Sequence, residues 1–252
     1  MIISEKTSSN QARRKKRKVL KVVISSILVF VSLVIIGCSV FQIYHKNRYG
    51  HFWVNGQSMY PTLNKNAKYK DGALIGEYDS SDRDGNYDVD YGYMDEKEST
   101  LDKLSRFDII ICSYNDSSRK VIKRLIALPG ETFYISMSTP GKSDNGNLYI
   151  QNKETSEYSL VKQPLDDSLV HGGTYTSEFS TPYTLKDNEY FVMGDNRKGA
   201  NSSDSRTPSN HVYRNHIYGK VIGLEAYCTI VKVGPDEYDY KDVKHYFPWR
   251  SL

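Results

Sequence analysis

The sequence predicts a mainly β domain that follows one N-terminal transmembrane helix. Three observations predict this class. Residues 22–44 form an uncharged, largely apolar run of 23 residues. Short segments rich in β-branched residues recur through the rest of the chain, separated by Gly, Pro, Asn and Asp turn signals. No long amphipathic helical pattern occurs outside the apolar run, so we expect a partly open barrel or a sandwich of coiled sheets.

A basic arm precedes the apolar run. Residues 1–21 carry eight Lys or Arg and one acid, whereas the remaining residues have a net charge of −3. Because the positive charge is confined to this arm, composition excludes a broadly basic nucleic-acid-binding domain. The positive-inside bias predicts a cytoplasmic arm over 1–21, a transmembrane helix over 22–44 and an extracytoplasmic domain over 45–252. A 23-residue helix measures about 35 Å, enough to cross a hydrocarbon core of about 30 Å.

Two other interpretations of the apolar run compete with an anchor. One is a cleaved signal peptide, but the run is longer than the apolar core of such a peptide, and no Ala-x-Ala site follows it. Ile35-Ile36-Gly37-Cys38 resembles a lipoprotein signal box, in which the cysteine is lipidated. Lipidation or a helical anchor would equally hold the domain at the outer face of the lipid bilayer of the cell membrane.

The predicted strands begin soon after the anchor. We expect them at eight segments, namely 52–54, 73–75, 108–112, 121–127, 147–150, 190–193, 220–223 and 226–230. Segment 77–103 is acidic and has few residues to bury, so it predicts a solvated insert that projects from the fold. Segment 151–181 is hydrophilic and predicts a hairpin with loops.

The cysteines and histidines predict neither a disulfide framework nor a metal site. Cys38, Cys112 and Cys228 are odd in number and far apart. None of the six histidines forms a His-Glu-x-x-His motif, and His211 and His216 have no third ligand near them in the sequence. We therefore expect no metal and no cofactor.

Three segments carry residues suited to catalysis. Ser58 follows the strand 52–54 within Gly56-Gln57-Ser58-Met59-Tyr60-Pro61, which also fits a structural turn. Lys123 lies in the apolar strand 121–127, where burial would lower its pKa and let the neutral amine accept a serine proton; a lysine reaching to water is the alternative. The third segment, 191–206, contains Gly-Asp-Asn-Arg and Ser-x-Asp-Ser-Arg, whose Asp and Arg residues can tie down a loop.

Together, in this order and behind an anchor, these motifs resemble the type I signal peptidase family in its Gram-positive-like form. The resemblance covers 52–74, 106–131 and 147–230. It implies a signal-peptidase-type β fold and a membrane-anchored serine endopeptidase with a Ser–Lys dyad. Its partners would be exported precursor proteins, cut after small-x-small sites such as Ala-x-Ala.

The resemblance also implies a role for each matching residue. Ser58 matches the nucleophile and Lys123 the general base. Ser202 matches the hydroxyl that orients the lysine, but the loop 198–203 is two residues longer than usual, which leaves Ser203 as an alternative. The family's supporting ion pairs match Asp195 with Arg124 and Asp204 with Arg206. The residues lining two shallow pockets for small side chains match Phe52, Val54, Met59 and Ile122.

Two substitutions depart from the family pattern. Gly56 stands where some members have a Ser that donates to the oxyanion, and Phe107 replaces the usual Gly before Asp108. The main alternative function is a catalytically silent relative that assists surface-fibre (pilus) assembly, although such a protein would be expected to lack the Ser or the Lys. A repressor-type protease would need a DNA-binding domain, and a sortase would need a Thr-Leu-x-Thr-Cys strand. The oligomeric state and the identity of the precursors stay open.

Overall fold

The computed structural model describes residues 2–54, 56–65, 69–70, 73–74, 87–115, 117–199, 201–232 and 238–251. Its internal contacts divide the chain into two units, residues 1–48 and 49–252.

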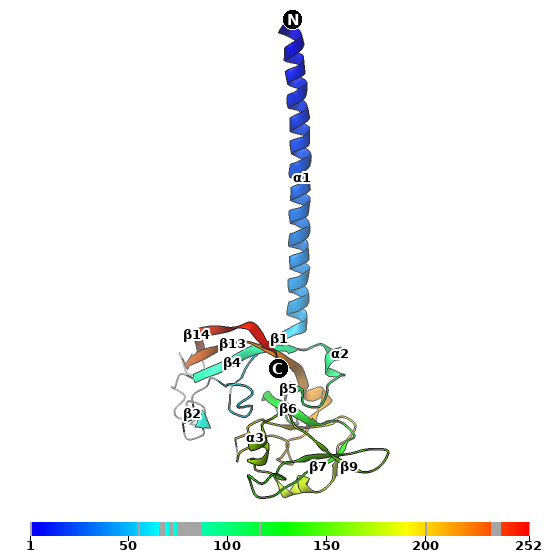
Figure 1. Ribbon diagram of the computed structural model, residues 1–252, viewed down its shortest axis with the longest axis vertical. Helices are drawn as coiled ribbons and strands as arrows, with labels where there is room; N and C mark the ends of the chain where they lie inside the picture. Colours follow the sequence, from blue (N-terminus) through cyan, green and yellow to red (C-terminus); the bar gives the residue numbers. More distant parts are fainter. Residues whose placement is uncertain are drawn as a thin grey trace. The chain divides into compact units, whose positions relative to one another are not determined.

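The first unit is a single helix, α1 (Ile2–Arg48), shown in blue in Figure 1. Its part from Lys16 to Arg48 is long and apolar enough to cross a membrane, with a mean hydropathy of 2.8 over its best 18-residue window. The Ser25 and Ser32 hydroxyls donate to carbonyls of the preceding turn, so neither polar group is left unsatisfied in the apolar stretch. The helix is longer than the predicted span 22–44 because the Lys, Arg, Gln and Ala of the arm are good helix formers.

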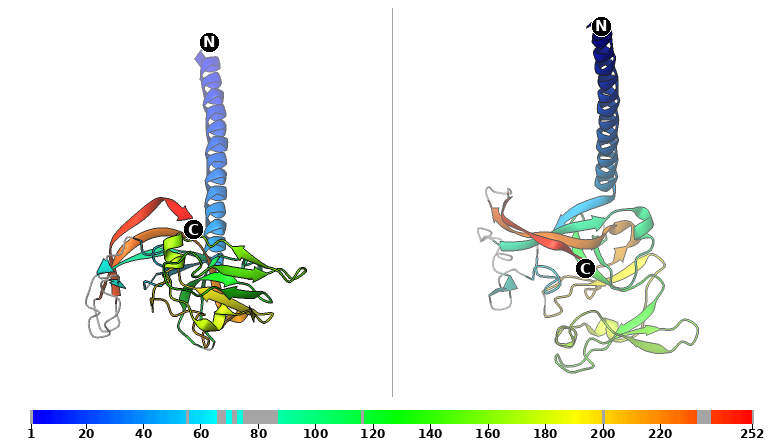
Figure 2. Two further views of the ribbon diagram at one scale, coloured as in Figure 1. Left: turned by 60° about the horizontal axis from the view of Figure 1, so that its bottom comes forward. Right: turned by 45° about the horizontal axis from the view of Figure 1, so that its top comes forward.

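An eight-stranded sheet organises the second unit and curls into a half-barrel (Figures 1 and 2). Its order is β1–β4–β13–β5–β6–β11–β12, with β14 paired to β13 and every pair antiparallel. The strands are β1 (Tyr49–Trp53), β4 (Tyr87–Asp95), β5 (Ile109–Cys112), β6 (Val121–Ala127), β11 (Glu189–Met193), β12 (Val212–Tyr213), β13 (Ile217–Lys232) and β14 (Tyr238–Ser251).

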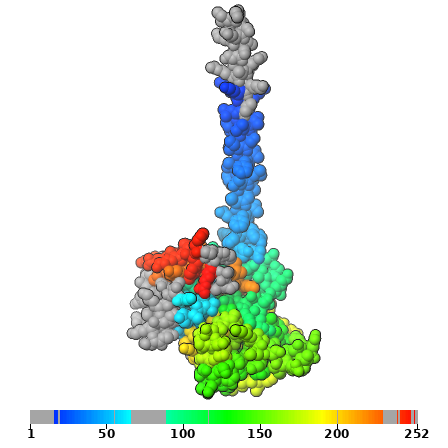
Figure 3. Space-filling model, in the orientation of Figure 1, coloured from blue at the N-terminus to red at the C-terminus, as the bar shows by residue number. Residues whose placement is uncertain are grey.

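A second, four-stranded sheet has the order β10–β7–β8–β9. Its residues, coloured green to yellow, form a compact lobe in the space-filling view (Figure 3). The strands are β7 (Thr132–Ile135), β8 (Leu148–Gln151), β9 (Tyr158–Val161) and β10 (Tyr183–Thr184), and the short helices α3 (Asp167–His171) and η1 (Ser177–Ser180) accompany them. The remaining elements are the two-stranded β2 (Tyr69–Lys70) and β3 (Ala73–Leu74), and the helices α2 (Glu98–Leu101) and η2 (Arg214–His216).

Separate apolar clusters hold the two sheets. Phe133, Phe179 and Phe191 join the smaller sheet to β11, with ring centroids 4.7 to 6.1 Å apart. The half-barrel encloses a second cluster, in which Phe52 and Val54 pack with Met94 and other residues of β4, β5 and β13. This second cluster fixes β1 and the turn that follows it against the rest of the sheet.

Most predicted strands are present within one or two residues of their expected bounds, and β6 matches its predicted range. Ile75, at the end of the predicted strand 73–75, lies outside the described residues. Segments 220–223 and 226–230 form one strand, β13, instead of two, because its register shifts at irregularities without interrupting the pairing. Region 151–181 contains one strand of a hairpin, β9, whose partner β8 lies almost entirely before the region; two short helices follow β9.

The prediction of a projecting insert over 77–103 is wrong for residues 87–95. They form β4, which pairs with β1 on one side and β13 on the other. Two of its carboxylates are buried and have donors: Asp90 accepts from the Asn64 N–H and the Tyr246 hydroxyl, and Asp95 accepts from Thr100. Residues 77–86 of the predicted insert lie outside the described part of the chain.

Candidate active site

Ser58 lies in a tight turn just after β1. Gly56 has φ of +121°, a backbone conformation that favours glycine, and this explains why no larger residue stands there. The Asn64 amide donates to the carbonyls of Val54 and Gly56, which closes the turn from within. The Ser58 carbonyl accepts from the Asn196 N–H at 3.0 Å, so the turn is also tied to the loop after β11.

Lys123 lies next to this serine. Its Nζ is 2.8 Å from Ser58 Oγ and donates to the Ile122 carbonyl at 2.9 Å. The side chain comes from β6 and is 3% exposed. Burial lowers the pKa of Lys123, the nearby Asp204 and Cys112 act in the opposite direction, and the net pKa lies below its usual value. The arrangement therefore favours a neutral amine within proton-transfer distance of a serine hydroxyl.

The segment Ser202–Arg206 brings a buried carboxylate close to Lys123. Asp204 accepts from the Ser202 hydroxyl, the Gly194 N–H and the Arg206 guanidinium. Burial alone would raise the Asp204 pKa, but the charge and hydrogen bonds of Arg206 outweigh it and hold the pKa below its usual range. Asp204 is consequently ionised at neutral pH, and its charge opposes the effect of burial on Lys123.

The predicted pair Asp195 and Arg124 forms a buried, two-point contact. Arg124 Nε and a terminal nitrogen donate to the two carboxylate oxygens at 2.8 and 2.6 Å. Thr62 adds a third donor to Asp195, and Arg124 also donates to the Phe107 carbonyl. The pair therefore links β6, the loop after β11, the Ser58 turn and the segment before β5.

Ser202 and Ser203 have different surroundings. The Ser202 hydroxyl donates to Asp204, and it lies so close to Gly194 that a Cβ there would come within 2.2 Å of its oxygen. Ser203 is exposed; its carbonyl accepts from the Tyr114 hydroxyl and its own hydroxyl from Asn210. Among the described residues, Lys123 Nζ has its hydrogen bonds with Ser58 and Ile122, and the expected bond between Ser202 and Lys123 is not formed. Ser202 instead donates to Asp204, whose charge raises the pKa of Lys123.

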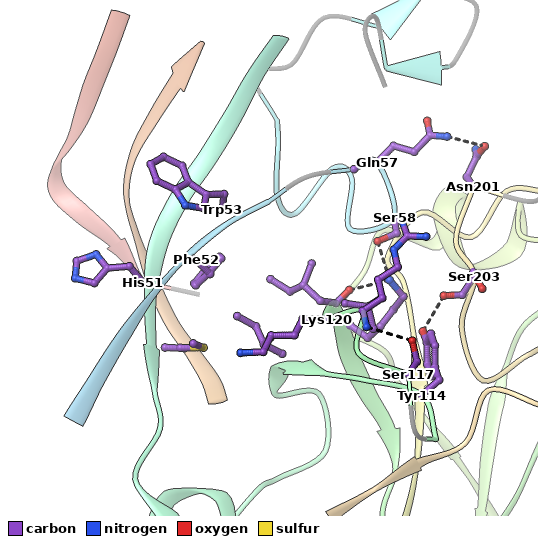
Figure 4. Close-up of a pocket in the computed structure, with 17 residues that line it drawn as sticks. His51, Phe52, Trp53, Gln57, Ser58, Tyr114, Ser117, Lys120, Asn201 and Ser203 are labelled. Carbon is purple, nitrogen blue, oxygen red and sulfur yellow. Dashed lines mark hydrogen bonds between the residues drawn. The ribbon is translucent and has the colours of Figure 1, made fainter. Parts of the chain in front are cut away.

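A cleft of about 850 Å³ opens beside Ser58 and Lys123. Figure 4 shows His51, Phe52 and Trp53 of β1 on one side, and Ser58, Ser117 and Lys120 on the other. Of the four residues predicted to line substrate pockets, Phe52 and Ile122 line this cleft. Val54 and Met59 do not line it; they are buried, at 1% and 0% exposure, in the apolar cluster that also contains Phe52.

Sequence reasoning missed two polar contributors to the cleft wall, Tyr114 and the Gln57–Asn201 contact. The Gln57 amide donates to Asn201 at 3.4 Å, and its buried carbonyl oxygen has no partner among the described residues. Asn201 donates in turn to Asn196, which holds the Ser58 turn. No motif identifies these residues, because their contacts join segments more than 80 positions apart.

The other potential reactive groups are accounted for by burial and partners. Burial raises the pKa of the Cys112 thiol to about 12, so this cysteine stays protonated at neutral pH. His211 pairs with Glu189, and His171 contacts the Asn145 carbonyl. Within the described part of the chain, no group of three or more His, Cys, Asp or Glu is arranged to hold a metal ion.

The serine–lysine contact lies inside a region that a known family matches. Residues 20–224 match the family "Signal peptidase, peptidase S26". The chain belongs to this signal peptidase family. It is 32% identical over 195 residues to signal peptidase I U of Bacillus subtilis, covering 77% of this chain and 80% of that protein. Signal peptidase I of Bacillus amyloliquefaciens is 30% identical over 67% of this chain and 69% of its own length.

Among solved structures, a signal peptidase I from Enterococcus faecalis is 27% identical, with a TM-score of 0.33, and covers 47% of this chain and 96% of that one. Membership makes the present chain a serine endopeptidase of the S26 signal peptidase family. Its apolar helix α1 is consistent with the membrane anchoring expected of this family.

The structure also explains a departure of this signal peptidase from the family pattern. Phe107 has φ of +73°, in the left-handed region that favours glycine. Its carbonyl accepts from Arg124, and its N–H donates to the Leu125 carbonyl, so the backbone at this position is held from both sides. The usual glycine would adopt this conformation without strain, whereas here the strain is offset by these bonds and by packing of the Phe107 ring against the core of the smaller sheet.

Proposed function

We propose that this signal peptidase removes signal peptides from exported precursors with a Ser58–Lys123 dyad. The observation that carries the proposal is the 2.8 Å separation of Lys123 Nζ and Ser58 Oγ, combined with the burial that lowers the pKa of the lysine. Family membership supports the substrate class, because the relatives it matches are named signal peptidase I.

The reaction begins with the precursor in an extended conformation beside β1. In the described sheet β1 pairs only with β4, so its other edge can accept a substrate strand. Phe52 and Ile122 then contact the residues before the scissile bond, and we expect small side chains there. This geometry predicts cleavage after small-x-small sites.

Neutral Lys123 takes the Ser58 proton as Oγ attacks the scissile carbonyl. The negative charge develops on the former carbonyl oxygen, where the Ser58 N–H is available as a donor; one such donor contributes about 2.7–4 kcal/mol. Lys123 then transfers the proton to the leaving amine, and the C–N bond breaks to leave an acyl-enzyme on Ser58. Water deprotonated by Lys123 releases the signal peptide as a free carboxylate.

The supporting residues act through the lysine and the turn. Asp204 holds Ser202 and limits how far burial lowers the pKa of Lys123. Arg124 and Asp195 hold β6 against the Ser58 turn. We assign Ser202, Asp195, Arg124, Asp204 and Arg206 this positioning role.

The test uses the full chain in detergent and a precursor with an Ala-x-Ala site, with the cut located by mass spectrometry. Ser58→Ala and Lys123→Ala should abolish cleavage, and Lys123→Arg should not restore it because a guanidinium stays protonated. Lys142→Ala and Ser143→Ala, in the exposed turn between β7 and β8, are matched controls that should keep full activity. Normal cleavage by Ser58→Ala would refute the dyad, and no cleavage by the unaltered protein would favour the silent pilus-assembly alternative.

We further propose that α1 anchors the protein with its N-terminus in the cytoplasm and residues 45–252 outside. The basic arm and the apolar segment Lys16–Arg48 support this orientation. Protease added to intact cells should degrade the second unit. Protection of that unit would overturn the orientation, and a mature protein that begins with a lipidated Cys38 would replace the helical anchor by a lipid.

A further inference from the structure

Arg119 and Lys120, just before β6, form a positively charged lip of the cleft. Arg119 and Lys120, both exposed, line the cleft together with Ser117 and Tyr114 (Figure 4 labels Lys120 and Ser117). Arg119, Lys120 and Lys123 are cleft residues, whereas none of the described residues that line the cleft is Asp or Glu. The cleft is therefore a basic environment even when Lys123 is neutral.

No described carboxylate neutralises these two cations. The Arg119 backbone N–H donates to Ser117, and its guanidinium has no hydrogen bond or ion pair with a described residue. Lys120 Nζ lies 4.6 Å from the centroid of the Tyr218 ring, a cation–π contact that positions the ammonium without cancelling its charge. Asp116 lies outside the described residues; even with it, segment 113–123 has three basic residues and one acid.

Other basic residues of the second unit provide a contrast. Arg106, Arg124, Arg206, Arg214 and Lys220 each form an ion pair with a carboxylate. Arg119 and Lys120 differ from these residues because they face an open cleft and no described carboxylate balances their charge. Such a site attracts an anionic group that enters the cleft.

We propose that Arg119 and Lys120 bind an acidic side chain of the precursor, so that the protein prefers precursors with Asp or Glu near the scissile bond. The inference rests on the proposed function and names a substrate class for that site. Lys120 precedes Lys123 by three residues, which corresponds to about 10 Å along a strand. An extended precursor spans the same distance in about three residues, so the acidic residue lies within about three to five residues of the cut.

The experiment measures kcat/KM on a set of peptides with one Ala-x-Ala site. Each of the five positions on either side of the cut carries Asp in one peptide and isosteric Asn in its partner. At 50 mM salt, we expect one or two positions at which Asp is cleaved about three- to tenfold better than Asn. The preference should vanish at 0.5 M salt, because exposed charges are then largely screened.

The double variant Arg119→Gln/Lys120→Gln should bring the Asp-to-Asn ratio to about one. The ratio is the readout because Arg119 also lowers the pKa of Lys123, and a change in the rate of chemistry cancels in it. Lys142→Gln, an exposed lysine in the turn between β7 and β8, is the control that should leave the ratio unchanged.

A ratio near one at every position for the unaltered protein would overturn the inference while leaving the proposed function intact. A salt-independent ratio, or one that survives the double variant, would also overturn it. If the double variant alters cleavage only when anionic lipid vesicles replace neutral ones, the lip contacts lipid headgroups instead. Failure to cleave any peptide would refute the proposed function itself.

Discussion

A Gly194→Ala variant tests whether the close packing of Gly194 against the Ser58 turn positions the nucleophile. A Cβ at this residue would lie 2.3 Å from the Ser58 carbonyl oxygen and 2.2 Å from Ser202 Oγ. Even the tightest normal contacts of a Cβ are about 3.0 Å, so Gly194→Ala requires about 0.7 Å of movement. The serine carbonyl is backbone and is held by the Asn196 N–H, so the movement must displace the turn that carries Ser58.

Displacements of about 1 Å can cost about 100-fold in rate, so we expect Gly194→Ala to lower kcat by about 30- to 100-fold. Overpacking should also lower stability by about 1–3 kcal/mol. The assay is peptide cleavage by the full chain in detergent, with the thermal midpoint measured in parallel.

Gly141→Ala is the matched control for this variant. Its Cβ would meet nothing within 4 Å, but its φ of +93° imposes backbone strain, so stability falls without any steric clash and far along the chain from Ser58. It should lose stability and keep kcat. If Gly194→Ala retains kcat within about threefold of normal while its stability falls like that of the control, the close approach does not position Ser58 and the reasoning is refuted.

Three further predictions concern Lys123, Tyr114 and the Asp195–Arg124 pair. Lys123→Met should abolish cleavage but raise the thermal midpoint at pH 7, because a lysine with a lowered pKa binds a proton more readily in the unfolded state. This gain in thermal midpoint should shrink as the pH rises towards the ordinary lysine pKa. A gain that does not depend on pH would contradict the lowered pKa of Lys123. Tyr114→Phe removes the bond to the Ser203 carbonyl and should lower stability by about 0.5–1.5 kcal/mol. Because Ser203 precedes Asp204, whose charge raises the pKa of Lys123, the variant should also shift the pH profile of kcat with little change in KM; an unchanged profile would show that this bond has no influence on Lys123. Asp195→Ala should lower the free energy of unfolding, measured by chemical denaturation, by about 3–5 kcal/mol because it leaves Arg124 buried and unpaired. The control Glu98→Ala breaks the exposed pair with Arg214 and should lower it by at most about 1 kcal/mol. Equal losses of stability would refute the role of burial.

The acidic segment 77–103 shows where composition misleads. Asp88 and Asp90 alternate with Tyr87, Val89 and Tyr91, and the low apolar content of the whole segment predicted a solvated loop. The structure pairs β4 on both sides and supplies donors to Asp90 from two residues distant in sequence, Asn64 and Tyr246. Because those donors are brought close only by folding, no local pattern identifies a buried acidic strand.

The local sequence by itself determined the apolar helix, the strand β6 and the presence of Ser58 and Lys123 in recognisable motifs. Hydrophobic length, β-branched runs and turn residues are local properties, so they can be read without tertiary information. Tertiary structure alone decided that Lys123 is buried beside Ser58 and that Ser202 contacts Asp204. It also decided that Val54 and Met59 are buried in the core while Phe52 and Ile122 line the cleft. It also decided that Arg119 and Lys120 face the cleft, because burial, pKa and charge exposure depend on which distant strands pack together and not on the neighbours of a residue in the chain.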